Sequence, residues 1–371
     1  MKTSDFNYNL PKELIAQAPC ANRDQCRMLV LDKSTGEVQD KHFYDIVDFV
    51  DPGDLLVANE TRVLPARLIG TKRGTEGEAE LLLLRNLAET HDANTWEALV
   101  KPGRRLKPAS VSEKQNTTRS VSCGEKGPVV DFVNEIGEIV LSAEVIDWGS
   151  AEGTRIVRLT SEVCDIDEAI HKVGATPLPP YIHGYTGNME MYQTVYSVNE
   201  TSAAAPTAGL HFTEELIARL RERGIGWATV ELEVGIDTFK PVTEDDPRDH
   251  QMHTEMRSIS QETIDRINET KANGCRVIAV GTTSVRTLES AWDEKTGGLK
   301  PVDREPTNLF ILPGYEFKCV DAMITNFHVP QSTLMMLVTA FGGYDNVMNA
   351  YTHAVESKYR FLSFGDAMFI K

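Results

Sequence analysis

The fold is decided by the stretch Arg276-Val-Ile-Ala-Val-Gly-Thr-Thr-Ser-Val-Arg286. Its apolar run predicts a buried β-strand, and the small hydroxyl-rich turn that follows leads into a helix. Upstream, residues Trp227 to Leu232 predict another strand, and a helix is predicted from about Gln261 to Ala272. An order of strand, helix and strand is typical of an α/β layer.

A strand-rich segment interrupts this pattern. The texture of the sequence changes near Thr61 to Arg67 and again near Glu152 to Val157. Between these points, clusters of Gly, Asn, Asp and Lys separate four short apolar runs, which are Glu80–Leu84, Trp96–Val100, Pro128–Phe132 and Glu138–Leu141. Several short strands at such spacing favour a small barrel or sandwich.

Composition limits the class of protein. The chain has 371 residues, enough for two domains, because single cores usually stop growing at roughly 250 to 300 residues. The first ten residues are polar and no stretch reaches the roughly 18 apolar residues of a membrane span, so we expect a cytoplasmic protein. The six cysteines include no Cys-x-x-Cys pair, which favours reduced thiols over a disulfide framework or a cysteine zinc site.

The net charge of −17 is unusual for a nucleic-acid binder, because phosphate contacts favour a basic surface. Any RNA site must therefore be local. The candidate is the segment Lys101-Pro-Gly-Arg104-Arg105-Leu-Lys107, which holds four cations in seven residues. A solvated basic turn explains the same residues equally well.

Two segments are candidates for ligand binding. The turn from Gly281 to Arg286 follows a strand, where it offers backbone N–H groups and hydroxyls to an anionic or ribose-bearing ligand. It has neither the dinucleotide nor the Walker glycine pattern, and a simple helix cap is the alternative. Asn59 and Arg62 follow another apolar strand, where they suit phosphate or carboxylate recognition or an interdomain ion pair.

Two histidines in polar loops, His211 and His328, are candidates for proton transfer. Imidazole exchanges a proton near neutral pH, and a capped or core histidine is the alternative. Asp366, near the carboxyl end, is either a pocket residue or a packing group. His250 and His253 are three residues apart without a helical His-Glu-x-x-His arrangement, which favours hydrogen bonding over a metal site.

Eight segments also occur in one order along the chain, and they are Leu10–Pro19, Asp54–Leu68, Pro177–Ile182, Tyr192–Tyr196, Ala204–Thr213, Ala279–Glu289, Val320–His328 and Tyr359–Ile370. Together they closely resemble the S-adenosylmethionine:tRNA ribosyltransferase-isomerase family of the queuosine pathway. The resemblance covers nearly the whole chain. It implies an α/β domain of residues 1–62 and 156–371, and an inserted six-stranded β-barrel of residues 63–155.

The resemblance also implies a reaction. The ribosyl group of S-adenosylmethionine is transferred to 7-aminomethyl-7-deazaguanine at the anticodon wobble position of tRNA and isomerised to an epoxycyclopentanediol. Adenine and methionine leave, and epoxyqueuosine remains. S-adenosylmethionine is then a cosubstrate, with no permanent cofactor and no metal, because the sulfonium already supplies activation. We expect a monomer that does not bind a membrane.

Such chemistry requires placed acids and bases in a water-excluded site. The expected proton-transfer residues are His211, His328, Asp321 and Asp366. The expected residues for the cosubstrate or target nucleotide are Gly281, Thr282, Thr283, Ser284, Arg286, Asn59 and Arg62. The expected RNA-binding residues are Lys101, Arg104, Arg105 and Lys107.

Three positions depart from the family pattern. The family typically has His where Glu233 stands and often Gly where Asp237 stands, and Gly is usual where Thr201 stands. The first change replaces an imidazole with a carboxylate, which puts a catalytic role at that position in doubt. Two other functions remain open, which are a non-enzymatic RNA-binding protein and an S-adenosylmethionine methyltransferase. The missing early glycine-rich turn counts against the methyltransferase.

Overall fold

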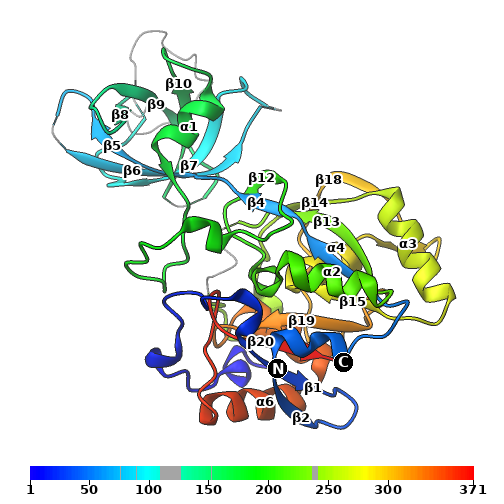
Figure 1. The fold of residues 1–371 in the computed structure, drawn as a ribbon. Helices are drawn as coiled ribbons and strands as arrows, with labels where there is room; N and C mark the ends of the chain where they lie inside the picture. The colour runs from blue at the N-terminus through cyan, green and yellow to red at the C-terminus, as the bar shows by residue number, and fades with distance from the viewer. Residues whose placement is uncertain (76, 89, 109–126, 152, 236–240) are drawn as a thin grey trace. The chain divides into compact units, whose positions relative to one another are not determined.

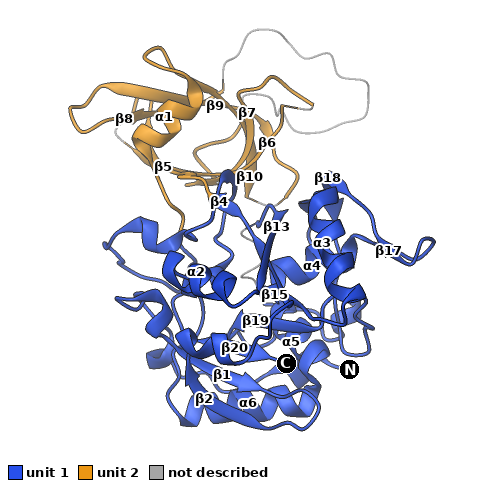
Figure 2. Ribbon diagram, turned by 45° about the vertical axis from the view of Figure 1, so that its right-hand side comes forward, with its two compact units in different colours: residues 1–62, 178–371 blue, residues 63–177 orange. Residues whose placement is uncertain are grey.

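The computed structural model describes residues 1–75, 77–88, 90–108, 127–151, 153–235 and 241–371. The chain forms two compact units (Figure 2). Unit 1 comprises residues 1–62 and 178–371, and unit 2 comprises residues 63–177. Unit 1 is an α/β domain and unit 2 is a small antiparallel barrel (Figure 1), so the predicted fold class is confirmed.

A nine-stranded mixed sheet forms the centre of unit 1. In spatial order its strands are β18 (Val302–Thr307), β14 (Glu255–Ile259), β13 (Gly226–Leu232), β3 (Leu55–Asn59), β15 (Val277–Val280), β19 (Ala322–Asn326), β20 (Ala367–Ile370), β1 (Arg27–Leu31) and β2 (Val38–His42). Strands β13, β3, β15 and β19 are parallel to one another. Strand β20 is antiparallel to β19 and parallel to β1.

Helices cover both faces of this sheet, because its central strands are apolar on both sides. Along β3, Leu55 and Val57 belong to one buried cluster while Leu56 and Ala58 belong to another, as the two-residue period of a strand requires. The first cluster includes apolar residues of α3 (Gln261–Ala272), α4 (Thr282–Ser290), α5 (Thr333–Gly342) and α6 (Tyr344–Glu356). The second includes α2 (Glu214–Glu222) and the 3-10 helix Phe43–Asp48.

The predicted strand, helix and strand are present as β13, α3 and β15. Strand β14 lies between β13 and α3 in the sequence and pairs antiparallel with β13, which the sequence pattern did not indicate. Ser260 starts α3 by accepting a hydrogen bond from the Thr263 backbone N–H, and Ser332 caps α5 in the same way. Side-chain caps of this kind satisfy N–H groups that a helix leaves free at its start.

Unit 2 is a closed barrel. Its strands in order are β5 (Arg67–Lys72), β6 (Glu78–Asn86), β7 (Thr95–Lys101), β10 (Thr154–Thr160), β9 (Ile139–Trp148) and β8 (Val129–Val133), and β8 pairs with β5 to complete the ring. Helix α1 (Ile166–Val173) contributes Ala169 and Ile170 to the barrel core. Unit 2 therefore runs to residue 177, whereas the sequence predicts a return to the main domain at residue 156.

The remaining strands are short. Strand β11 (Gly174–Ala175) pairs with β5, β4 (Thr61–Val63) pairs with β12 (Asn199–Ser202), and β16 (Trp292–Asp293) pairs with β17 (Gly298–Leu299). Among the described residues, no helix has the length and apolar character that crossing a membrane requires.

Candidate functional site

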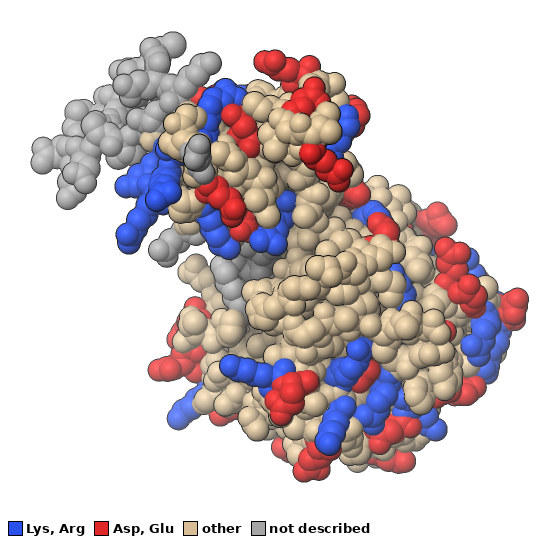
Figure 3. All heavy atoms as spheres, turned by 60° about the vertical axis from the view of Figure 1, so that its left-hand side comes forward, with Lys and Arg blue, Asp and Glu red and all other residues tan. Residues whose placement is uncertain are grey.

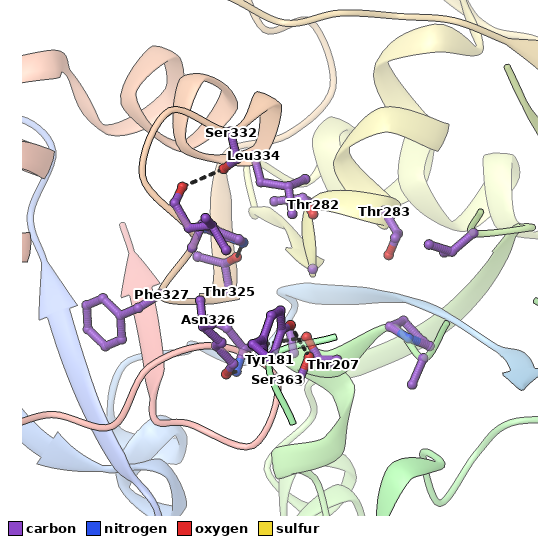
Figure 4. Close-up of a pocket in the computed structure, with 18 residues that line it drawn as sticks. Tyr181, Thr207, Thr282, Thr283, Thr325, Asn326, Phe327, Ser332, Leu334 and Ser363 are labelled. Atoms are coloured by element: carbon purple, nitrogen blue, oxygen red, sulfur yellow. Dashed lines mark hydrogen bonds between the residues drawn. The ribbon is translucent and has the colours of Figure 1, made fainter. Parts of the chain in front are cut away.

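A pocket opens at the carboxyl ends of β15 and β19, which are parallel neighbours in the sheet of unit 1. About 650 Å³ of space that no protein atom fills lies in and around this pocket, including open solvent at its mouth. Figure 4 shows side chains that reach it from the start of α4, from the end of β19 and from the segments around Thr207 and Ser363. Ligands of open α/β sheets bind at this edge of the strands.

The turn after β15 forms one wall of the pocket. Gly281 has φ of 90°, a left-handed conformation that glycine adopts without strain. Thr282 and Thr283 follow in the first turn of α4, where backbone N–H groups have no acceptor within the helix. The Thr283 Oγ1 atom is buried, and no hydrogen-bond partner for it lies in the described ranges. Ser284 instead secures the turn, since its hydroxyl donates to the Val280 carbonyl at 2.8 Å.

His328 also lines the pocket and is 8% exposed. Its backbone N–H donates to the Tyr351 hydroxyl oxygen at 3.0 Å, and its Nδ1 lies 3.3 Å from the same oxygen. Its Nε2 lies 3.3 Å from Thr325 Oγ1. The Tyr8 hydroxyl donates to the His328 carbonyl oxygen. His328 is therefore held at its backbone by two tyrosines and at its ring by one of them.

His211 lies behind the pocket rather than on its surface. It touches Asn326, which lines the pocket, through a contact of 3.1 Å between Asn326 Nδ2 and His211 Nε2. The same Nδ2 donates to the Leu362 carbonyl at 3.3 Å, and the Thr207 hydroxyl donates to Asn326 Oδ1 at 2.9 Å. Because a carbonyl only accepts, the amide orientation is fixed and His211 Nε2 is an acceptor. The proton of His211 is then on Nδ1, 3.0 Å from Cys26 Sγ.

Both histidines are uncharged near neutral pH. Burial lowers the pKa of His211 to about 3, with a further contribution from the cations Arg360 and Arg23. Burial alone lowers the pKa of His328 to about 3. Desolvation disfavours the charged form of an imidazole. Each ring therefore offers one N–H donor and one nitrogen acceptor to its neighbours.

Arg286 does not reach the pocket. Its guanidinium forms a buried ion pair with Glu255 of β14 and donates from Nε to the Leu309 carbonyl at 3.2 Å. Burial alone raises the pKa of Glu255, but Arg286 and hydrogen bonds from His253 and the Gly235 N–H lower it to about 2. Arg286 thus joins α4 to β14, and the structure does not bring it together with Thr282 and Thr283 around a ligand.

Asn59 and Arg62 also lie outside the pocket lining. Asn59 joins β3 to β13, because its Nδ2 donates to the Leu232 carbonyl at 3.0 Å and its Oδ1 accepts from the Leu232 N–H at 3.2 Å. Arg62 forms ion pairs with Glu190 at 2.5 Å and with Glu200 at 3.4 Å. Asn59 therefore has a backbone partner, and the ion pairs of Arg62 lie within unit 1 rather than between the two units.

The two candidate aspartates lie at opposite ends of the sheet. Asp321 precedes β19, at the end away from the pocket, where it accepts from the Val277 N–H at 2.8 Å and pairs with Lys271 at 3.2 Å. Asp366 precedes β20 and accepts from the backbone N–H groups of Arg27 at 3.0 Å and Arg360 at 2.7 Å. Burial raises the pKa of Asp366, against the opposing effect of these hydrogen bonds and of Arg360.

Of the three residues that depart from the family pattern, Glu233 and Thr201 have different surroundings. Glu233 pairs with Arg304 of β18, with 2.9 Å between Arg304 Nε and Glu233 Oε1. Its neighbour Val234 lines the pocket, but the Glu233 carboxylate is directed to this ion pair at the sheet edge. Thr201 is an exposed residue of β12. Asp237 lies outside the described residues.

The backbone of the basic segment of unit 2, residues 101–107, accepts hydrogen bonds from Arg155. The largely buried Arg155 donates from Nε to the Leu106 carbonyl at 2.8 Å and from Nη2 to the Gly103 carbonyl at 3.1 Å. Its guanidinium also lies 4.0 Å from the ring centre of Trp148. This support leaves the four cations exposed, and they are Lys101, Arg104, Arg105 and Lys107. Figure 3 shows Lys and Arg side chains gathered on this unit, with acidic side chains beside them.

His250 and His253 have carboxylate partners. His250 Nδ1 lies 3.0 Å from Glu244 Oε2, and His253 Nε2 lies 3.1 Å from Glu255 Oε1. Within the described part of the chain, no three His, Cys, Asp or Glu side chains are grouped so that they could hold a metal ion.

Sequence reasoning missed several pocket residues. Thr207, Thr325 and Asn326 line the pocket, and their signal was available, since each lies within four residues of a candidate histidine at the end of a strand or loop. Tyr351 gave no such signal. It lies on the buried face of α6, where an aromatic residue is read as core packing.

Comparisons with known proteins place the whole chain in one family. The family model described as queuosine biosynthesis protein matches residues 3–370. A curated relative from Clostridioides difficile (strain 630), named S-adenosylmethionine:tRNA ribosyltransferase-isomerase, is 49% identical over the full length of both chains. The crystal structure of an S-adenosylmethionine tRNA ribosyltransferase from Thermotoga maritima is 36% identical, with a TM-score of 0.52 over 99% of this chain and 100% of that one.

Proposed function

Because this chain belongs to the queuosine biosynthesis protein family, we propose that it uses S-adenosylmethionine to modify tRNA as a ribosyltransferase-isomerase. More specifically, it transfers the ribosyl group to 7-aminomethyl-7-deazaguanine at the wobble position and isomerises that group to an epoxycyclopentanediol. Adenine and methionine are the released products.

One observation carries the proposal, which is the pocket at the carboxyl ends of β15 and β19. It combines the hydroxyls of Thr282 and Thr283, and the backbone N–H groups that the first turn of α4 leaves without an acceptor in the helix, with apolar side chains such as Val234 and Leu334. Hydroxyls and helix-start N–H groups suit the ribose hydroxyls and carboxylate of S-adenosylmethionine. Apolar walls exclude water, which protects reactive intermediates from hydrolysis.

The positions of the four proton-transfer candidates suggest different roles for them. Of these four, His328 is the residue that lines the pocket, and we assign it contact with the cosubstrate. His211 acts through Asn326, so it is a positioning residue. Asp366 and Asp321 bind backbone N–H groups, which gives them structural roles. An uncharged His328 also suits a sulfonium ligand, because an imidazolium would repel it.

The released products test the function. Incubated with S-adenosylmethionine and tRNA that carries the precursor base, the protein is expected to release adenine and methionine in equal amounts, measured by mass spectrometry, while the tRNA gains the ribosyl-derived mass. A methyltransferase would release S-adenosylhomocysteine instead. An RNA-binding protein without activity would leave S-adenosylmethionine intact, and either result contradicts the proposal.

We also propose that the basic segment of unit 2 contacts tRNA phosphates. Changing Lys101, Arg104, Arg105 and Lys107 to alanine is expected to weaken tRNA binding and to reduce the slope of log K against log salt by roughly one for each lost phosphate contact. Filter binding over a salt series measures both quantities. The double variant Arg219→Ala/Arg221→Ala, on exposed positions of α2, serves as the control for loss of charge alone. An unchanged slope in the quadruple variant rules the segment out.

A further inference from the structure

Tyr351 contacts His328 from behind the pocket and has no role in the function described so far. Its side chain is fully buried, and its hydroxyl oxygen lies 3.0 Å from the His328 backbone nitrogen and 3.3 Å from His328 Nδ1. A phenol hydroxyl has one hydrogen to donate and oxygen lone pairs to accept with. The direction of each hydrogen bond can therefore be assigned.

The backbone N–H of His328 can only donate, so the Tyr351 oxygen accepts from it. The hydroxyl hydrogen then needs an acceptor, and within the described residues Nδ1 is the atom in hydrogen-bond contact that can accept it. If Nδ1 carried the hydrogen instead, two donors would face the oxygen and the buried hydroxyl hydrogen would have no partner. A buried donor without an acceptor is strongly disfavoured.

We infer that Tyr351 is a positioning residue that holds His328 in the tautomer with hydrogen on Nε2, so that the pocket wall presents a hydrogen-bond donor, the Thr325 hydroxyl, to the bound nucleoside. The Nε2–H donates to Thr325 Oγ1 at 3.3 Å, and both residues line the pocket. The Thr325 hydroxyl hydrogen is then left for a ligand. The identity of the ligand rests on the proposed function. The tautomer of His328 rests on the hydrogen bonds to Tyr351 alone.

The direction of these hydrogen bonds determines which ligand group can bind at the end of the series. Hydrogen bonds point from Tyr351 through His328 and Thr325 toward the pocket, so the matching group is an uncharged acceptor, such as a ribose oxygen or an adenine ring nitrogen. The low pKa of His328 keeps the ring neutral, in agreement with a donor that carries no charge. A fixed tautomer matters because a wrongly placed imidazole hydrogen can remove most of a catalytic residue's contribution.

His211 provides an internal reference for the tautomer, because its ring hydrogen is on the other nitrogen. Asn326 donates to its Nε2, so its hydrogen is on Nδ1. The two buried histidines should therefore give opposite patterns in one nitrogen-15 spectrum of histidine-labelled protein. Signals among the nine histidines are assigned by their loss in His328→Gln and His211→Gln.

Two tyrosine variants provide the decisive comparison. Tyr351→Phe removes the hydroxyl at the ring, while Tyr8→Phe removes the hydroxyl that donates to the His328 carbonyl. We expect wild type and Tyr8→Phe to show hydrogen on Nε2 of His328, and Tyr351→Phe to shift it wholly or partly to Nδ1. In the product assay, Tyr351→Phe should lower kcat roughly 10- to 100-fold, the scale seen when a hydrogen-bond partner that orients a metal-binding side chain is removed, with little change in KM.

The result that overturns the inference is a wild-type His328 with hydrogen on Nδ1 or on both nitrogens. An unchanged tautomer or an unchanged kcat in folded Tyr351→Phe overturns it as well. The wild-type spectrum decides the tautomer even if the variant does not fold. Because the spectrum needs no substrate, a failure of the proposed function, seen as the absence of adenine release, remains distinguishable from a failure here.

Discussion

Glu255→Ala is expected to destabilise the protein by about 3–5 kcal/mol, the usual cost of leaving one member of a buried ion pair without its partner. The side chains of Arg286 and Glu255 are 5% and 2% exposed. Arg286 Nη2 already has no hydrogen-bond partner in the described ranges, so the variant leaves its charge with little compensation. Urea unfolding followed by circular dichroism measures the change.

Two further variants separate this effect from general loss of charge. Asp48→Ala removes a pair with Arg223 in which the side chains are 68% and 47% exposed, and it should cost less than about 1 kcal/mol. The double variant Glu255→Leu/Arg286→Met should be more stable than Glu255→Ala, because it removes both buried charges. If Glu255→Ala were as stable as Asp48→Ala, Arg286 would not be a structural residue, and its predicted role in ligand binding would return.

Stability is expected to fall steeply as the pH is lowered from 6.5 to 5. In the unfolded chain, histidine binds a proton below its ordinary pKa of about 6.5. In the folded protein His211 and His328 stay neutral, since burial lowers the pKa of each to about 3. The stability is therefore complete above pH 6.5 and is lost progressively toward pH 3. Each histidine contributes roughly 1.4 kcal/mol per pH unit within that window.

Unfolding free energies at several pH values test this expectation. His211→Gln and His328→Gln should each reduce the slope by about 1.4 kcal/mol per pH unit. His183→Gln, at an exposed position, serves as the control and should leave the slope unchanged. Equal slopes in wild type and in both buried variants would mean that these histidines are accessible to protons in the folded state.

The fold was predictable because its signals are local. The apolar run before Gly281 predicts strand β15. Gly281 itself indicates a turn, because glycine adopts the positive φ found there without strain. The short apolar runs likewise indicated the barrel. The partner of a strand is not a local property, and residues 154–160 do not reveal that they pair with β7 and β9. The structure places this segment in the barrel for that reason.

The candidate site was predictable in part. The sequence placed Thr282, Thr283 and His328 in the loops that form the pocket, because polar residues at the ends of buried strands are visible as a pattern. Arg286 belongs to the same segment as Thr282 and Thr283, but its partner Glu255 lies on strand β14, 31 residues earlier in the chain. The distinction between His211 behind the pocket and Asn326 at its surface depends on side-chain direction, which sequence spacing does not fix.

Strand β20 has a consequence for synthesis of the protein. It lies between β19 and β1 in the sheet, and its residue Ala367 is the partner of Met28, 339 positions earlier. While a ribosome makes the intervening residues, the edge of β1 that pairs with β20 has no partner in the sheet. Pairings this distant slow folding and leave edges available to other chains. During synthesis this edge of β1 therefore stays available to other chains until β20 has been made.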